Sequence, residues 1–399
     1  MQGGSNVADE SAGKRPRRDS LLVFGSPLIG EEEIAEVEAT LRSGWIGTGP
    51  RVAQFESDFA AYVGAEHAVA MNSCTAALHV AMLAIDLQPG DEVITTPMTF
   101  AATANSIVHS GASLVFADCD RETMNIDPDA IAAAITPRTK AILPVHFAGR
   151  ACDMDAINAI ASEHDLRIIE DCAHAIETKI DGRHAGRFSD AGCFSFYVTK
   201  NMVTGEGGML VTDNPEVAAR AKILSLHGLD RDAWHRFGDS GYKHYSVVAA
   251  GFKYNMMDLQ AAIGLHQLAR VETSLTRREE IWAEYDEAFA DLHCATPAPA
   301  AAGTRHARHL YTLLLDVDQL PFSRDSVIDR LTELNIGVGV HYVALHLHPF
   351  YQRLLGITAD DFPNAAYVAQ RTLSLPLSAK LTDDDVQDVI HAVRHTLDA

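Results

Sequence analysis

The stretch HAVAMNSCTAALHVAMLAIDLQPGDEVITT, residues 67–96, decides the fold class. Residues 67–71 form a short apolar run that predicts a buried strand, and 91–96 form a second one. Between them, residues 75–85 have the composition of a helix. A strand, a helical crossover and a second strand are typical of a parallel pair in an α/β fold.

The same alternation continues along the chain. Further strands are predicted at SLVFA (113–117), KAILPVH (140–146) and LRIIED (166–171), and a helix at MDAINAIASEH (154–164). Apolar strands about 25 residues apart, joined by helices, predict a mostly parallel sheet covered on both faces. Ligands of such sheets bind at the carboxyl ends of the strands, so the residues that follow each strand are the candidates for chemistry.

The chain divides into three predicted parts. Residues 1–20 are expected to be a disordered tail, 21–254 a large α/β domain, and 255–399 a connecting helix with a small α+β domain. The large domain begins with an acidic helix that carries Ile34, Val37 and Leu41 at helical spacing and ends at Gly44. The small domain follows a long helical pattern and the Ala/Pro stretch 294–304.

Composition narrows the class of protein. The 399 residues include 32 Lys plus Arg and 54 Asp plus Glu, a formal charge of −22, which disfavours nucleic acid and anionic membranes as partners. The first 20 residues lack an apolar signal-peptide region, and their KRPRR cluster is predicted to be part of the disordered tail. Six scattered cysteines without a CxxC pair predict free thiols, no metal site and a cytoplasmic location.

Polar and aromatic residues follow the predicted strands. Ser73 and Thr75 stand where a helix begins, and they either cap that helix or bind a phosphate. Phe100 follows the next strand, as a core residue or as a cover for a flat ligand. Asp171 ends a buried strand and needs donors or a cation, and His174 follows as a packed histidine or a ligand contact.

Lys200 lies in CFSFYVTKNMVTGEGGML, residues 193–210, between an alternating apolar run and a glycine-rich loop. On composition alone it is a solvated surface lysine. A lysine desolvated in a pocket instead becomes a nucleophile for a carbonyl. Together with a phosphate-binding helix start, an aromatic cover and a buried aspartate, it describes a pyridoxal phosphate site. The glycines are expected to let the chain pass close to the cofactor.

Seven segments between residues 22 and 399 resemble one family, the DegT/DnrJ/EryC1/StrS sugar aminotransferases. They are SGWIGTGPRVAQFE, NSCTAALH, PMTFAATAN, PVHFAGRACDMDAI, EDCAHA, SFYVTKNMVTGEGG and GFKYNMMDLQAAIGL. The resemblance implies the aspartate-aminotransferase-like fold, called fold type I, and a homodimer whose sites are shared between subunits.

The resemblance assigns roles around the cofactor. Lys200 is carried over as the lysine that forms the internal aldimine with pyridoxal phosphate, and Asp171 as the partner of the ring nitrogen. Phe100 is carried over as the stacking aromatic, and His174 lies beside the ring hydroxyl.

The phosphate contacts are carried over in the same way. They are assigned to Ser195 and to the turn of Ser73, Cys74 (through its backbone) and Thr75.

The partner subunit is expected to complete the phosphate site through the segment GFKYN. Lys253 stands there where many members have asparagine, and either Lys253 or Asn255 makes the contact. Trp45, Thr48 and His341 are candidates for the sugar and nucleotide pocket; their alternatives are a core tryptophan, a turn threonine and a satisfied loop histidine.

The implied reaction is transamination in amino-sugar biosynthesis, for an antibiotic or a polysaccharide. L-Glutamate gives its nitrogen to the cofactor, which passes through its pyridoxamine form, and 2-oxoglutarate leaves. A nucleotide-linked 4-keto sugar, such as a dTDP-4-keto-6-deoxyhexose or a UDP- or dTDP-4-keto pentose, receives the nitrogen. The alternatives are a 3-keto sugar, a sugar dehydratase, which Lys200 disfavours, and a regulatory member of the family.

Overall fold

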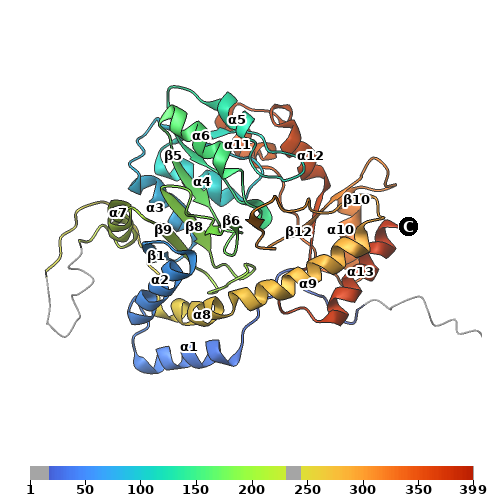
Figure 1. Ribbon diagram of the computed structural model, residues 1–399, viewed down its shortest axis with the longest axis horizontal. Helices are drawn as coiled ribbons and strands as arrows, with labels where there is room; N and C mark the ends of the chain where they lie inside the picture. Colours follow the sequence, from blue (N-terminus) through green and yellow to red (C-terminus); the bar gives the residue numbers. More distant parts are fainter. Residues whose placement is uncertain (1–17, 231–243, 399) are drawn as a thin grey trace, which may run out of the picture.

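A computed structural model describes residues 18–230 and 244–398, and Figure 1 shows its arrangement. The helices are α1 (Glu31–Ser43), α2 (Pro50–Val63), α3 (Cys74–Ala84), α4 (Ala101–Ser110), α5 (Pro128–Ala134), α6 (Met154–His164), α7 (Pro215–Ser225), α8 (Asp258–Ala269), α9 (Val271–Phe289), α10 (Arg324–Glu333), α11 (Pro349–Leu355), α12 (Pro363–Arg371) and α13 (Asp383–Leu397). The strands are β1 (His67–Met71), β2 (Glu92–Thr95), β3 (Ser113–Phe116), β4 (Thr139–Leu143), β5 (Arg167–Asp171), β6 (Lys179–Ile180), β7 (Arg183–His184), β8 (Ala191–Ser195), β9 (Gly208–Thr212), β10 (Cys294–Ala295), β11 (Thr304–Arg305), β12 (Tyr311–Leu315) and β13 (Thr372–Leu375).

The central sheet has seven strands in the order β1-β9-β8-β5-β4-β2-β3. All neighbours pair in parallel except β9, which runs antiparallel to both β1 and β8. Strands β1, β2, β5 and β8 therefore point the same way, and their carboxyl ends lie along one edge. The predicted mostly parallel sheet is confirmed, with one antiparallel strand inside it.

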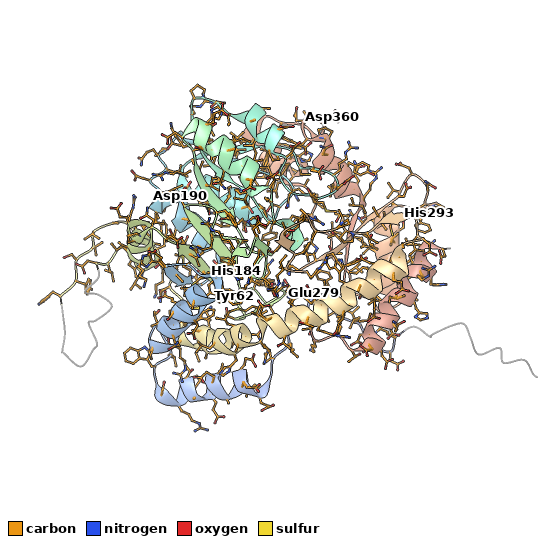
Figure 2. All side chains as sticks on the ribbon, viewed as in Figure 1. Tyr62, His184, Asp190, Glu279, His293 and Asp360 are labelled. Carbon is orange, nitrogen blue, oxygen red and sulfur yellow. The ribbon has the colours of Figure 1, made fainter. Side chains whose placement is uncertain are left out.

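Helices cover both faces of this sheet, as its apolar strands require. One face packs on α3, α4 and α7 through a core that includes Val69, Leu143 and Leu210. The other face packs on α2 and α8 near β1 and β9, and on α5 and α6 near β4 and β5. Side chains fill these layers; Figure 2 shows Tyr62 of α2 beside His184 of β7, with ring centroids 4.8 Å apart.

The C-terminal part has its own core around the sheet β10-β12-β13, packed on α9, α10 and α13. Helix α9 runs from beneath the central sheet to this second core (Figure 1). The long helical pattern after residue 255 is thus two helices, α8 and α9, which meet at Arg270. Arg270 leaves helical geometry there (φ −113°, ψ 7°), and its guanidinium pairs with buried Glu33 and with the Leu28 carbonyl.

The N-terminal segment lies against the C-terminal part. Leu22 pairs with Ile336 and exchanges backbone hydrogen bonds with Asn335 and Gly337. Arg18, within the predicted tail, pairs with Asp385 at 2.9 Å and with a second carboxylate of α13. Residues 1–17 of that tail lie outside the described residues, and the predicted domain boundary at 255 stays a prediction.

Helix α1 differs from its sequence pattern. It begins and ends as expected, with Gly44 in the left-handed conformation at its C-terminus. Its apolar residues Ile34 and Leu41, however, are 52% and 56% exposed, and its buried residues are Glu33 and Thr40. Two of the three apolar residues of the stripe therefore remain largely exposed on this chain, and Val37 is half-buried.

Within the described residues, no helix is both long enough and apolar enough to span a bilayer.

Candidate active site

The carboxyl ends of the parallel strands open into a cavity of about 620 Å³. It brings together residues from the starts of α3 and α4, from the ends of β5 and β8, from the glycine-rich loop, and from residues 340–342 of the C-terminal part. Nine predicted site residues line it: Ser73, Cys74, Thr75, Phe100, Asp171, His174, Ser195, Lys200 and His341. The other four predicted residues, Trp45, Thr48, Lys253 and Asn255, are not among its lining residues in the described chain.

Helix α3 begins at the cavity wall. Ser73 is its N-cap and accepts a hydrogen bond from the Ala76 N–H at 3.1 Å, so the capping role is real. The first N–H groups of a helix have no intrahelical acceptor and favour an anion, and Thr75 adds a hydroxyl to this end of the cavity. A Cβ on Gly208 would lie 2.4 Å from the Cys74 nitrogen, so this glycine lets β9 approach the helix start.

Asp171 closes strand β5 with only 3% of its surface exposed. One carboxylate oxygen accepts the Thr103 hydroxyl at 2.8 Å and the other accepts the Ala173 N–H at 3.1 Å. Burial raises its pKa above the usual range, and these two donors and the Lys200 charge oppose that rise. A carboxylate has about four acceptor sites, so the buried oxygens still have capacity for a further donor from the cavity.

Lys200 reaches the same cavity from the loop after β8. Among the described residues, no hydrogen bond or ion pair holds its ammonium group. Burial lowers its pKa to about 8, against the smaller raising effects of Cys74 and Asp171. At neutral pH such an amine is far easier to deprotonate than an exposed lysine, whose pKa is about 10.4. It is thereby prepared to act as a nucleophile or a base.

The next residue, Asn201, fixes the loop. Its amide nitrogen donates to Glu177 and to the Ala307 carbonyl, both at 2.8 Å, and its amide oxygen lies 2.9 Å from His309 Nδ1. Glu177 in turn is paired with buried Arg278 of α9. The loop that carries Lys200 is therefore tied to both the central sheet region and the C-terminal part.

Phe100 is 63% exposed at the start of α4, so it is a cavity residue and not a core residue. His174 is buried; its Nδ1 accepts the Ala148 N–H at 3.2 Å and its Nε2 lies 3.0 Å from the Tyr342 hydroxyl. Burial lowers the pKa of His174 well below its usual value, and Lys200 adds to this. His341 contacts Ser374 at 2.9 Å, and burial lowers its pKa to about 3.

The residues outside the cavity form a separate surface. Asn255 donates to the Thr48 hydroxyl at 2.6 Å, and Lys253 donates to the Asn255 oxygen at 2.5 Å. Trp45 is 47% exposed and donates to the Thr48 carbonyl at 3.1 Å, so it is not a core residue.

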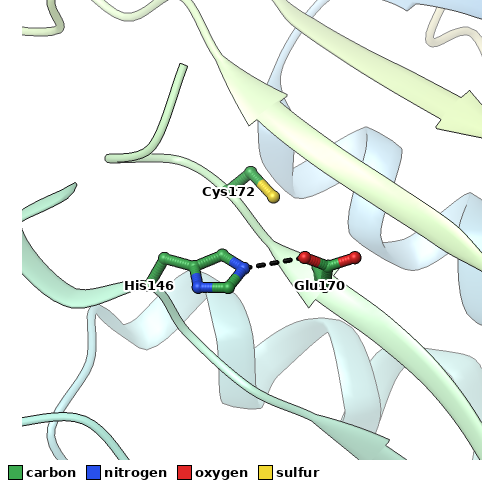
Figure 3. Close-up of side chains that lie close together, drawn as sticks. All are labelled: His146, Glu170 and Cys172. Carbon is green, nitrogen blue, oxygen red and sulfur yellow. Dashed lines mark hydrogen bonds and ion pairs between the residues drawn. The ribbon is translucent and has the colours of Figure 1, made fainter. Parts of the chain in front are cut away.

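A second buried cluster includes the two residues that flank Asp171 in the chain. Figure 3 shows His146, Glu170 and Cys172, with His146 Nε2 2.8 Å from Glu170. His146 Nδ1 accepts the Cys152 N–H at 3.0 Å, which leaves the proton on Nε2 for Glu170. Glu170 also accepts from Gly186 N at 2.7 Å, Phe188 N at 2.8 Å and Ser189 Oγ at 2.7 Å. These bonds satisfy the carboxylate and brace the strand that ends in Asp171.

Three contributors were missed by reasoning from the sequence: Thr103, Asn201 and Tyr342. Each stands beside or inside a segment that carried a predicted site residue, but its partner is distant in the chain. Only the fold shows that Thr103 contacts Asp171, or that Tyr342 contacts His174.

This fold and this cavity are those of a pyridoxal-phosphate-dependent aminotransferase of fold type I. The sequence profile of the DegT/DnrJ/EryC1/StrS aminotransferase family matches residues 27–394. The chain belongs to that family, and the solved structures that it resembles are sugar aminotransferases.

Similar proteins span nearly the whole chain. Spore coat polysaccharide biosynthesis protein SpsC of Bacillus subtilis (strain 168) is 53% identical over 95% of this chain and 97% of its own. The PLP form of the putative sugar aminotransferase Spr1654 from Streptococcus pneumoniae has a TM-score of 0.88 at 33% identity, covering 95% and 99% of the two chains. It is also solved in a PMP form. DesI, solved in the presence of its TDP-sugar product, has a TM-score of 0.84 at 33% identity, covering 96% and 94%.

The donor set of the cavity fits the cofactor of this family. A partnerless lysine amine suits an aldehyde, and a buried carboxylate with spare acceptor capacity suits a protonated ring nitrogen. A helix N-terminus with a threonine hydroxyl suits a phosphate. An exposed aromatic at the cavity suits a flat ring.

The lowered pKa of Lys200 gives the first prediction. Cofactor-free protein is mixed with pyridoxal phosphate at a series of pH values, reduced with borohydride, and analysed for modified Lys200 by peptide mass spectrometry. Because the free amine is the nucleophile, the capture rate rises with pH through a midpoint near 8. N-acetyl-lysine serves as the control and should titrate about two units higher. A midpoint for Lys200 at that control value would contradict the effect of burial.

Proposed function

We propose that the enzyme transfers the amino group of L-glutamate to the keto group of a nucleotide-linked 4-keto sugar. The observation that carries this proposal is the partnerless Lys200 amine, which shares one cavity with the buried Asp171 carboxylate. When bound, pyridoxal phosphate supplies an electron sink for the α-carbon of the donor.

The chain's own residues then have distinct tasks. Lys200 Nζ would hold the cofactor through its aldehyde at rest and, once released, would take the proton from the α-carbon of glutamate. Asp171 would hold the proton on the ring nitrogen, and the Thr103 hydroxyl fixes one oxygen of Asp171 at 2.8 Å. The anchored Asn201 keeps the loop of Lys200 in place while its side chain is released.

The phosphate and the ring face are held by the cavity wall. The start of α3, with Thr75, and Ser195 at the end of β8 would bind the phosphate. Phe100 would cover one face of the ring. His174 would act near the ring hydroxyl.

The residues that line the cavity support a sugar as the amino-group acceptor. No arginine is among its lining residues in the described chain, whereas enzymes for two amino acids need a fixed cation for each carboxylate. The donor glutamate must still bind in this cavity with its carboxylates. The lack of arginine therefore favours a sugar as acceptor but does not exclude a substrate that carries a carboxylate. The TDP-sugar product of DesI and the polysaccharide pathway of SpsC support a nucleotide sugar and a polysaccharide product. His341 is the cavity residue that would contact it.

The 4-keto position rests on the resemblance of three segments to that branch: EDCAHA, GFKYNMMD and HYVALHLHPFY. Amination at C3 is the competing outcome. The six cysteines, all free, support a reducing cytoplasm as the location.

The acceptor is tested with a panel of 4-keto and 3-keto nucleotide sugars, each supplied with L-glutamate. Mass spectrometry detects the aminated product, and NMR locates the new amine. We expect an amine at C4 with dTDP- or UDP-linked sugars. An amine at C3, or turnover only between free amino acids and keto acids, would contradict the proposal.

A homodimer that completes each site is the second part of the proposal. Five large apolar residues of α1 and of the segments around residues 45 and 257 are exposed on this chain: Ile34, Leu41, Trp45, Ile46 and Met257. The residues around 45 adjoin the segment of Lys253 and Asn255, because the Asp258 N–H donates to the Gly47 carbonyl at 2.9 Å. A second copy would bury the apolar residues and bring that segment to the partner's phosphate.

Complementation tests the shared site. Lys200→Ala is mixed with the double variant Lys253→Ala/Asn255→Ala under conditions in which subunits exchange. Half of a randomly mixed population is heterodimer, and one of its two sites has no lesion, so activity should recover to about a quarter of wild type.

Each variant alone, incubated in the same way, is the control and should stay inactive. Heterodimers that form, as shown by native mass spectrometry, but have no activity would contradict a contribution from the partner.

A further inference from the structure

Tyr342 is a cavity residue for which the reaction outlined above has no task. It lies in the segment of the C-terminal part that reaches the cavity. Its ring is fixed on several sides: its centroid lies 6.1 Å from Phe147, nearly edge-on, and 6.1 Å from Phe100. The position of its hydroxyl is therefore well determined.

The hydrogen-bond directions at His174 decide what that hydroxyl does. His174 Nδ1 accepts the Ala148 N–H, so Nδ1 carries no proton. The neutral ring then carries its proton on Nε2, 3.0 Å from the Tyr342 oxygen. His174 donates and the Tyr342 oxygen accepts. Within the described chain no residue accepts the phenolic proton of Tyr342, which is left for a ligand in the cavity.

The neighbours of this pair indicate which part of the ligand it meets. The titratable groups around it are Asp171, Lys200, His309 and His341. Burial raises the pKa of Tyr342 and the charge of Asp171 adds to this, whereas burial lowers the pKa of His174 and the charge of Lys200 adds to that. On the cofactor ring, the nitrogen and the carbon that bears the aldehyde are opposite each other. One edge between them carries a methyl group and the phenolic oxygen, and the other edge carries the phosphate arm. If Asp171 and Lys200 act as proposed and the start of α3 takes the phosphate, the edge with the phenolic oxygen is left for this pair, which lines the same cavity.

We propose that Tyr342 donates the hydrogen bond to the phenolic oxygen of pyridoxal phosphate, and that His174 is a positioning residue that acts on this oxygen through Tyr342. This inference rests on the proposed function. A donor to that oxygen stabilises its anionic form. Tyr342 would therefore set the pH at which the nitrogen linked to Lys200 loses its proton. Through it, the C-terminal part of the chain would act directly on the cofactor.

The test is the absorption spectrum of the cofactor-loaded protein, titrated with pH, without any substrate. Tyr342→Phe keeps the ring and removes only the donor. The midpoint of the spectral change should rise by about one unit, a tenfold change in the protonation equilibrium. The dissociation constant for pyridoxal phosphate, measured on cofactor-free protein by fluorescence, should rise in the same variant.

Variants of His174 separate a direct contact from an indirect one. His174→Leu should raise the midpoint as Tyr342→Phe does, and the double variant should go no further, because both act through one bond. His174→Gln should restore the wild-type midpoint, since its amide can accept from Ala148 and donate to Tyr342. Tyr285→Phe is the matched control: it loses a buried bond to the Pro376 carbonyl, distant from the cavity, and should not change the spectrum.

The outcomes are distinct. A wild-type midpoint and wild-type cofactor affinity in folded Tyr342→Phe would overturn the inference. So would a shift in His174→Leu alone, which would assign the contact to His174 itself. Wild-type protein that takes up no pyridoxal phosphate at Lys200 would instead overturn the proposed function.

Discussion

Burial of one lysine amine without a partner is the constraint on which the site depends. A charged ammonium is stable in water, and removing water from it favours the neutral amine. The fold imposes that cost on Lys200 and lowers its pKa to about 8. Asp171 opposes the effect only in part, because its carboxylate is already bound by Thr103 and Ala173. The cavity thus keeps a reactive amine and a carboxylate together without allowing them to neutralise each other fully.

The loop that carries Lys200 is held in place by contacts with other parts of the chain. Asn201, the next residue after Lys200, makes these contacts: both polar atoms of its side chain are used, in hydrogen bonds with Glu177, Ala307 and His309. The buried pair of Glu177 and Arg278 extends this network into α9, which reaches the second core. Breaking one member of a buried pair leaves an uncompensated charge, so the network is a costly one to disturb. The position of Lys200 therefore depends on the contact between the two parts of the chain.

The sequence predicted those features that depend on neighbours along the chain. The strands from 67–71 to 166–171 and the residues after them, including Asp171, follow from apolar runs and from the rule that strand ends meet. Features that depend on distant segments were not predictable. Thr103 and Tyr342 meet their partners across 68 and 168 residues. Helix α1 showed an amphipathic pattern, and that pattern did not predict that Ile34 and Leu41 would remain exposed on this chain.

The most direct test of the role of Lys200 is the glutamate half-reaction in the absence of any sugar. Cofactor-loaded protein is mixed rapidly with L-glutamate, and the cofactor absorbance and the 2-oxoglutarate released are followed over a single turnover. Wild type should release one equivalent per site. Lys200→Ala should release none on the same time scale, and Asp171→Asn should be slowed about a thousandfold, or roughly 4 kcal/mol in barrier. Release of 2-oxoglutarate by Lys200→Ala at the wild-type rate would contradict the account.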